Sequence, residues 1–221
     1  MNPLKRLTIL CGHYGSGKTN VAVNIAAELK KSHDSVTVAD LDIVNPYFRT
    51  KDSAAFFEEQ GIRLICSAYA NSNVDIPALP QEMYALTDDR SMTAVLDIGG
   101  DDRGALVLGR LAPKILAESD YEMLMVINCY RPLTRDVEST IEVMREIEFA
   151  CKIPFTGLVN NSNLGQETTP EDVLASLAYA EDVAKASGLP VVMTAFSEEL
   201  EAKLASKVPN PFPLNLQKKI I

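Results

Sequence analysis

The residues best suited to chemistry lie in one short stretch near the N-terminus. This stretch runs Gly12-His13-Tyr14-Gly15-Ser16-Gly17-Lys18-Thr19 and fits the Walker A pattern G-x-x-x-x-G-K-[ST]. In such a loop the glycines let backbone N–H groups converge on phosphate oxygens. The lysine pairs with the β- and γ-phosphates, and the hydroxyl after it ligates Mg²⁺. We therefore expect a phosphate-binding loop, with Lys18 also assisting catalysis, made of Gly12, Gly15, Ser16, Gly17, Lys18 and Thr19.

The sequence around this loop supplies the elements that must position it. Residues 7–11 form a short apolar run typical of a buried strand. Val21, Ile25 and Leu29 recur at helical spacing, so a helix is predicted to begin near Lys18. Its N-terminus would add partial positive charge at the phosphates. The alternative is a strand–turn–helix corner that is glycine-rich by chance.

Two further candidate residues are aspartates at the ends of predicted strands. Asp97 ends an apolar run and begins a D-x-x-G motif that finishes at Gly100. An aspartate in this position holds Mg²⁺ directly or through water, and the Gly100 N–H can approach the γ-phosphate. Asp42, which follows Asp40-Leu41, is suited to orienting an attacking water. The alternative is that these aspartates cap turns or helices, as aspartate often does.

The remaining sequence alternates between strand-like and helix-like runs. Further strands are predicted over residues 35–39, 62–66, 93–98, 123–128, 156–160 and 191–195. Helices are predicted over 18–31, 51–60, 80–88, 103–118, 134–150, 170–187 and 197–206, with Thr134 as an N-cap. This alternation predicts one α/β domain over residues 1–221, with a doubly wound, mainly parallel sheet and helices on both faces. The polar stretch 67–80 is the best candidate for a substrate loop.

Composition and charge argue against some functions. The net charge of −9 argues against broad, salt-driven binding to nucleic acid or to an anionic membrane. No apolar run reaches the ~18 residues of a membrane span, and the N-terminus is too short for a signal peptide. Cys11, Cys66 and Cys129 lie in strand-like runs and are expected to be buried. A reduced, cytoplasmic protein is expected.

Together these motifs resemble the MinD/ParA-type P-loop ATPases. The resemblance rests on the loop, the D-x-D ending at Asp42 and the D-x-x-G beginning at Asp97, in that order. The superfamily includes the nitrogenase iron protein, iron–sulfur carriers, and dethiobiotin and cobyrinate synthases. It implies a mainly parallel sheet of about seven strands and an ATP-dependent homodimer with the nucleotide near its interface. It also assigns hydrolysis to Asp42 and the metal ion to Asp97.

The resemblance extends to the base. The family's adenine-contacting asparagine follows a strand of the form G-hydrophobic-hydrophobic-x-N, and Gly157 to Asn161 match this form. The resemblance therefore implies that Asn161 contacts adenine. The sequence has no guanine-binding N-K-x-D motif, so ATP is favoured over GTP. The alternative for residues 160–163 is an ordinary polar loop.

One departure concerns the family's early lysine, which reaches the partner subunit's nucleotide. This chain has His13 in that position. Imidazole is shorter than a lysine side chain and is not a fixed charge at neutral pH. Cross-subunit activation would then need another cation, for which Arg49, Arg103 and Arg131 are the candidates.

A second departure concerns the cofactor. Cluster-binding relatives use paired cysteines, but residues 102–119 contain none, so no iron–sulfur cluster is expected. MinD-like proteins also carry a C-terminal amphipathic membrane helix. Here Pro211 and Pro213 interrupt the tail, which is expected to pack on the domain instead of forming a stable membrane anchor.

Three functions follow from these observations. The first is a slow Mg²⁺-ATPase switch that dimerises or binds an unknown protein partner or cargo. The second is an ATP-dependent transferase or ligase related to dethiobiotin or cobyrinate synthases, with its substrate on residues 67–80. The third is a regulatory module that binds nucleotide without hydrolysing it.

Overall fold

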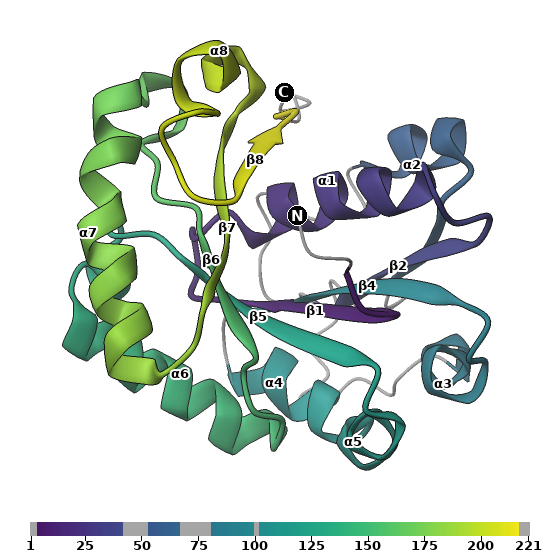
Figure 1. Cartoon of the computed structure of the whole chain (residues 1–221). Coiled ribbons are helices and arrows are strands. Elements are labelled where there is room, and N and C mark those ends of the chain that lie inside the picture. The colour runs from purple at the N-terminus through teal and green to yellow at the C-terminus, as the bar shows by residue number, and fades with distance from the viewer. Residues whose placement is uncertain (1–3, 42–52, 67–80, 100–101, 217–221) are drawn as a thin grey trace.

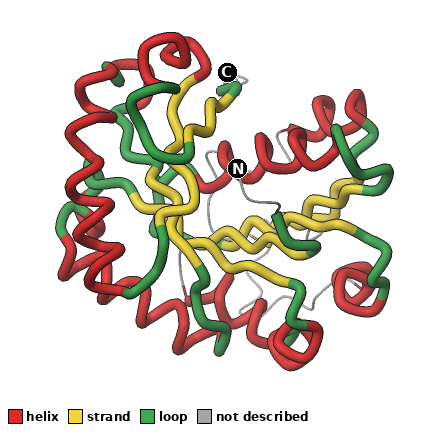
Figure 2. Tube along the Cα trace, in the orientation of Figure 1, coloured by secondary structure: helices red, strands yellow, loops and turns green. Residues whose placement is uncertain are grey.

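A single parallel β-sheet forms the centre of the molecule. The computed structural model describes residues 4–41, 53–66, 81–99 and 102–216. Eight strands are ordered β3-β2-β4-β1-β5-β6-β7-β8, and all neighbouring pairs are parallel (Figure 1). Helices cover both faces of the sheet, as Figure 2 shows. The predicted doubly wound α/β fold is therefore confirmed, with a strand count close to the expected seven.

The strands and helices follow one another along the chain in regular alternation. The strands are β1 (Leu7–Cys11), β2 (Val36–Leu41), β3 (Arg63–Cys66), β4 (Thr93–Ile98), β5 (Tyr121–Ile127), β6 (Gly157–Asn160), β7 (Val191–Ser197) and β8 (Pro211–Leu214). The α-helices are α1 (Lys18–Lys30), α2 (Ala54–Gln60), α3 (Gln81–Asp88), α4 (Asp102–Gly109), α5 (Ala112–Glu118), α6 (Val137–Cys151), α7 (Pro170–Ser187) and α8 (Glu201–Leu204). Short 3₁₀ turns lie at Pro132–Thr134 (η2), Gly165–Glu167 (η3) and Glu198–Leu200 (η4).

Two hydrophobic layers, one on each face, hold the helices to the sheet. Because side chains alternate along a strand, Ile9 of β1 faces one layer and Leu10 faces the other. The first layer contains residues of α3, α4, α5, α6 and α7. The second contains residues of α1 and α2. The helices that follow β1 and β4 therefore lie on opposite faces.

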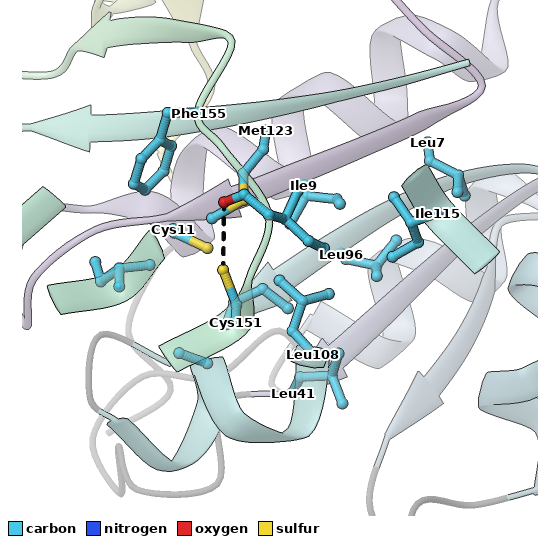
Figure 3. Packing of buried hydrophobic residues seen from close by; sticks show 14 of the residues in the cluster. Leu7, Ile9, Cys11, Leu41, Leu96, Leu108, Ile115, Met123, Cys151 and Phe155 are labelled. Atoms are coloured by element: carbon cyan, nitrogen blue, oxygen red, sulfur yellow. Dashed lines mark hydrogen bonds between the residues drawn. The ribbon is translucent and has the colours of Figure 1, made fainter. Parts of the chain in front are cut away.

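The first layer contains two buried cysteines. Figure 3 shows the sulfur atoms of Cys11 and Cys151 pointing toward each other among Leu, Ile and Met side chains. Cys151 also makes a weak hydrogen bond to the backbone oxygen of Ile153, at 3.5 Å. The expectation of burial is correct for Cys11 but wrong for Cys66, which is exposed where the short strand β3 ends. Cys129 is half-buried.

Three helix predictions needed correction. Residues 197–206 contain the end of β7, the 3₁₀ turn η4 and the short helix α8 in place of one continuous helix. Residues 103–118 form two helices, because α4 ends at Gly109 and α5 begins at Ala112. The N-cap of α6 is Asp136, whose carboxylate accepts a hydrogen bond from the Ser139 N–H. Thr134 belongs to the preceding 3₁₀ turn, and its hydroxyl donates to the Asn128 carbonyl at 2.8 Å.

The C-terminal tail adds the last strand to the sheet. β8 pairs with β7, and Phe212 packs into the second hydrophobic layer. Prolines are tolerated because β8 is an edge strand. The predicted strap on the domain is confirmed up to residue 216, and residues 217–221 lie outside the described part. In the described residues, no helix has the length and apolar character needed to cross a membrane.

Arg6, just before β1, forms a buried ion pair with Glu118. Its guanidinium also donates to the backbone oxygens of Met92, at 2.7 Å, and Leu86, at 3.0 Å. The side chains of Arg6 and Glu118 are only 8% and 5% exposed. This cluster joins the amino end of β1 to α3 and α5.

We expect Arg6→Ala to lower the free energy of unfolding by about 3–5 kcal/mol, because it leaves the Glu118 carboxylate buried without its cation. Urea titration monitored by circular dichroism measures this change. Lys185→Ala is the control, because Lys185 forms only exposed ion pairs and should change stability by less than about 0.5 kcal/mol. Equal effects of the two substitutions would contradict the stabilising role of the Arg6 cluster.

Candidate nucleotide-binding site

The site lies where neighbouring strands send the chain to opposite faces of the sheet. β1 pairs with β4, yet α1 follows β1 onto one face and α4 follows β4 onto the other. Diverging connections leave a crevice at the carboxyl ends of such strands, where open α/β sheets bind ligands. The glycine-rich loop and Asp97 meet at this point.

The backbone of the loop adopts a conformation that few residues other than glycine allow. Gly15 has φ 77° and Gly17 has φ 84°, both left-handed. Between them, the Ser16 N–H donates to the His13 carbonyl at 3.0 Å and closes a turn. Helix α1 begins directly afterwards at Lys18 and has no acidic residue in its first turn. The loop and the helix N-terminus therefore present N–H groups suited to an anion.

Close packing also requires glycine at two positions. A Cβ atom at position 12 would lie 2.5 Å from the Val126 carbonyl oxygen of β5. One at position 17 would lie 2.3 Å from the Asn161 amide nitrogen. The loop is thus pressed against the ends of β5 and β6.

Thr19 and Asp97 are in direct contact at the carboxyl end of β4. The Thr19 hydroxyl donates a hydrogen bond of 2.7 Å to Asp97 Oδ2. Both side chains are buried, as is Lys18, which is 3% exposed. Mg²⁺ in nucleotide sites is held by one or two protein oxygens together with phosphates and water. A hydroxyl and a carboxylate in contact at the foot of a phosphate loop fit that requirement.

The surroundings include two polar groups with different roles. Ser16 is 1% exposed, and no side chain or backbone group in the described ranges forms a hydrogen bond with its buried hydroxyl. Buried hydroxyls usually have a partner, so a ligand oxygen fits this position.

Burial raises the pKa of the Cys11 thiol well above its usual value, Cys151 and Asp97 raise it further, and Lys18 lowers it. Cys11 thus remains a protonated thiol at neutral pH, unsuited to act as a nucleophile.

The loop after β6 holds the phosphate loop in place. Asn161 is 3% exposed, and its amide nitrogen donates to the Ser16 carbonyl at 2.7 Å. Its backbone N–H donates to the Ile127 carbonyl at 2.9 Å. Asn128, which our predictions did not single out, accepts hydrogen bonds from the N–H groups of Tyr130 and Asn163. The sequence signal for Asn128 was its position at the end of an apolar run.

Arg131 contacts the phosphate loop from the connection after β5. Its Nε donates to the Gly15 carbonyl at 2.9 Å. His13 is half-buried, and its Nδ1 lies 3.1 Å from the Tyr14 carbonyl oxygen. Arg131, one of the three candidates to replace the family's lysine, therefore contacts the phosphate loop. Arg49 and the Arg103 side chain lie outside the described part of the chain.

Several predicted residues cannot be located in the same way. Asp42 follows directly after the last residue of β2, Leu41, but it belongs to the undescribed range 42–52. Gly100 and the polar stretch 67–80 are also outside the described residues. Asp40 is buried within β2 and pairs in register with Asp97.

Comparison with known proteins places the fold among P-loop NTPases. No protein-family model and no curated protein matches the chain. Among solved structures, cell division protein FtsY from Thermotoga maritima matches with a TM-score of 0.58 and 18% identity, covering 89% of this chain and 63% of that one. FtsY from Mycoplasma mycoides matches with a TM-score of 0.53 and 14% identity, covering 86% of this chain and 59% of that one. FlhF complexed with GTP and Mg²⁺ matches with a TM-score of 0.54 and 15% identity, covering 86% of this chain and 64% of that one.

The chain thus spans about three fifths of the length of these structures. At such low identity the likeness establishes the fold alone. FtsY and FlhF are not the MinD/ParA-type ATPases that the motifs resemble, so the likeness extends to the broader group of P-loop NTPase folds. It confirms the three-layer α/β architecture expected from the sequence.

Gly17→Ala should destabilise the protein by about 2–4 kcal/mol, because the new Cβ adds a clash with Asn161 to the cost of a left-handed residue. Gly188→Ala is the matched control: Gly188 has φ 74°, but nothing lies within 4 Å of the point that a Cβ there would occupy. It should cost only about 1 kcal/mol. Chemical denaturation measures both values. If Gly17→Ala were no worse than the control, the packing of Asn161 against the loop would be refuted.

Proposed function

We propose that the protein binds ATP with Mg²⁺ and hydrolyses it slowly, as a cytoplasmic nucleotide-gated switch of MinD/ParA type. The observation that carries this proposal is the Thr19–Asp97 hydrogen bond beneath the phosphate loop. It brings two motifs 78 residues apart to the place where a metal–triphosphate complex would bind. Mg²⁺, when bound, would neutralise charge on the β- and γ-phosphates.

Each predicted residue then has a task in this function. Lys18 would pair with the β- and γ-phosphates, and the loop backbone would surround them. Thr19 and Asp97 would hold the metal ion, with Asp97 acting directly or through water. Asp42 would orient the attacking water, and the Gly100 N–H would contact the γ-phosphate.

The base is proposed to be adenine. FlhF, a structural neighbour, was crystallised with GTP and Mg²⁺, so guanine is the alternative. The Asn161 amide nitrogen faces the Ser16 carbonyl, which leaves Oδ1 as the atom suited to contacting a base. An acceptor suits the adenine amino group and disfavours the guanine O6, which is itself an acceptor. The absence of N-K-x-D in the sequence supports the same choice.

Lys18→Ala should weaken ATP binding by about a hundredfold or more, because it removes a buried cation from the triphosphate. Isothermal titration with ATP, GTP and ADP in the presence of Mg²⁺ measures binding and base preference together. Lys31→Ala, on an exposed lysine at the end of α1, should bind as the wild type does. Equal affinity of Lys18→Ala and the wild type for ATP would contradict the proposed site, and a preference for GTP would contradict the base assignment.

Asp42→Asn tests hydrolysis separately from binding. We expect its single-turnover rate to fall by about a hundredfold, since an amide orients and activates water poorly. ATP affinity should change less than about threefold. An unaltered rate would remove Asp42 from the mechanism. Wild-type binding without turnover would instead favour a regulatory module, and turnover only with an added small metabolite would favour a transferase or ligase.

A homodimer formed in the ATP state is the proposed assembly, with an unidentified protein partner or cargo. Tyr14 on the phosphate loop and Leu133, two residues after Arg131 in the chain, are 54% and 51% exposed, so both are available to a partner. Sedimentation velocity with a non-hydrolysable ATP analogue should show dimer, and with ADP monomer. Leu133→Ser should weaken this dimer, whereas Phe149→Ser, near the distant end of α6, should not. A monomer in both nucleotide states would overturn the dimer.

A further inference from the structure

The Arg131 side chain contacts the phosphate loop of the same subunit. Its Nε donates to the Gly15 carbonyl at 2.9 Å. The guanidinium atoms Nε and Cζ lie 3.4 and 3.7 Å from the point where a Gly15 Cβ would be. A side chain at position 15 would therefore occupy the space next to the guanidinium. The two residues are 116 positions apart in the sequence, and the pairing of β1 with β5 brings their segments together.

The charges around the loop leave this guanidinium available to a ligand. Arginine has five N–H donors and keeps its charge at any physiological pH. One donor is used on Gly15, and among the described residues no carboxylate pairs with Arg131. The side chain is half-buried, so water screens its charge less than it would a surface arginine. Four residues along the chain, Arg135 differs in each respect: it is exposed and pairs with Asp136.

Two loops rich in hydrogen bonds fix the position of Arg131. The backbone N–H of Arg131 donates to the Asn128 carbonyl at 3.1 Å, and the Thr134 hydroxyl donates to the same oxygen at 2.8 Å. Asn128 Oδ1 in turn accepts from the Asn163 N–H, which ties this connection to the loop after β6. A cation held in this way requires little rearrangement to act on a phosphate.

We propose that Arg131 contacts the terminal phosphate of the nucleotide bound to its own subunit, so that hydrolysis needs no cation from a partner. The inference rests on the proposed function and adds to it the source of the charge for which His13 is unsuited. Hydrolysis joins the oxygen of water to the γ-phosphorus and breaks the bond from that phosphorus to the bridging oxygen. ADP, inorganic phosphate and a proton are released. Arg131 would stabilise the negative charge that grows on these oxygens.

Arg131→Gln separates a phosphate contact from a purely structural role. We expect its kcat to fall by about a hundredfold or more, as for other arginines that act on a γ-phosphate. Binding of ADP with aluminium fluoride should weaken by a similar factor, whereas binding of ADP alone should change less than about threefold. Arg135→Gln removes the same charge nearby and should match the wild type. Arg131→Lys should recover part of the rate, and thermal melting checks that each variant is folded.

A mixing experiment tests whether the contact is made within one subunit. Lys18→Ala retains Arg131 but has a defective site, and Arg131→Gln retains an otherwise intact site. If Arg131 acts within its own subunit, an equimolar mixture has no more ATPase activity than the sum of the two variants. If it acts on the partner's nucleotide, mixed dimers regain activity at one of their two sites, and that result would overturn the proposal.

Other outcomes are equally decisive. Loss of ADP binding and ATP binding to the same extent in Arg131→Gln would show that Arg131 only shapes the loop. A wild-type kcat in Arg131→Gln would show that it does not contact the reacting phosphate. Either result overturns the role of Arg131 and leaves the proposed ATPase standing. Failure of the wild-type chain to bind any nucleotide would instead overturn the proposed function, and this inference with it.

Discussion

The hydrogen bond between Thr19 and Asp97 is the contact on which the candidate site depends. It joins α1, the helix after β1, to the end of β4. It forms because β1 and β4 are parallel neighbours, so their carboxyl ends lie side by side. The following helices lie on opposite faces, which is the arrangement at which open α/β sheets bind ligands. The apolar layers on the two faces keep the strands in register and thereby hold a hydroxyl and a carboxylate together.

The phosphate loop is held from two sides by groups that come from later in the chain. Asn161 donates to the Ser16 carbonyl, and Arg131 donates to the Gly15 carbonyl. With these two carbonyl oxygens engaged by the scaffold, the loop keeps the backbone conformation that turns its N–H groups toward a ligand. Such preorganisation lowers the cost of ordering the loop when an anion binds.

Much of the fold could be predicted from local sequence. Apolar runs such as 7–11 and 93–98 indicated buried parallel strands, and Gly12 to Thr19 indicated the loop, because each pattern depends on neighbouring residues alone. Boundaries were less accurate. Thr134 and Asp136 are both good caps, and two hydrogen bonds decide that α6 begins after Asp136: Thr134 donates to Asn128, and Asp136 accepts from the Ser139 N–H. Cys66 was misplaced because an edge of the sheet cannot be distinguished from its centre in a short apolar run.

The site was predictable in its parts but not in its contacts. The motifs identified Thr19, Asp97 and Asn161, while the engagement of Asn161 with the loop, and of Arg131 with Gly15, depends on strand order. That order places β5 next to β1 and β6 next to β5, and it exists only in the folded chain. The role of Asp42, on which the proposed hydrolysis depends, rests on the sequence motif.

Calorimetric titration of ATP into the wild type and Thr19→Ala, with Mg²⁺ and with EDTA, shows directly whether Thr19 and Asp97 form a metal–nucleotide site. We expect Mg²⁺ to tighten ATP binding to the wild type by about tenfold or more. Thr19→Ala should lose most of this gain while still binding ATP in EDTA. Identical responses to Mg²⁺ in the two proteins, or no ATP binding by either, would contradict a metal–nucleotide site at this pair.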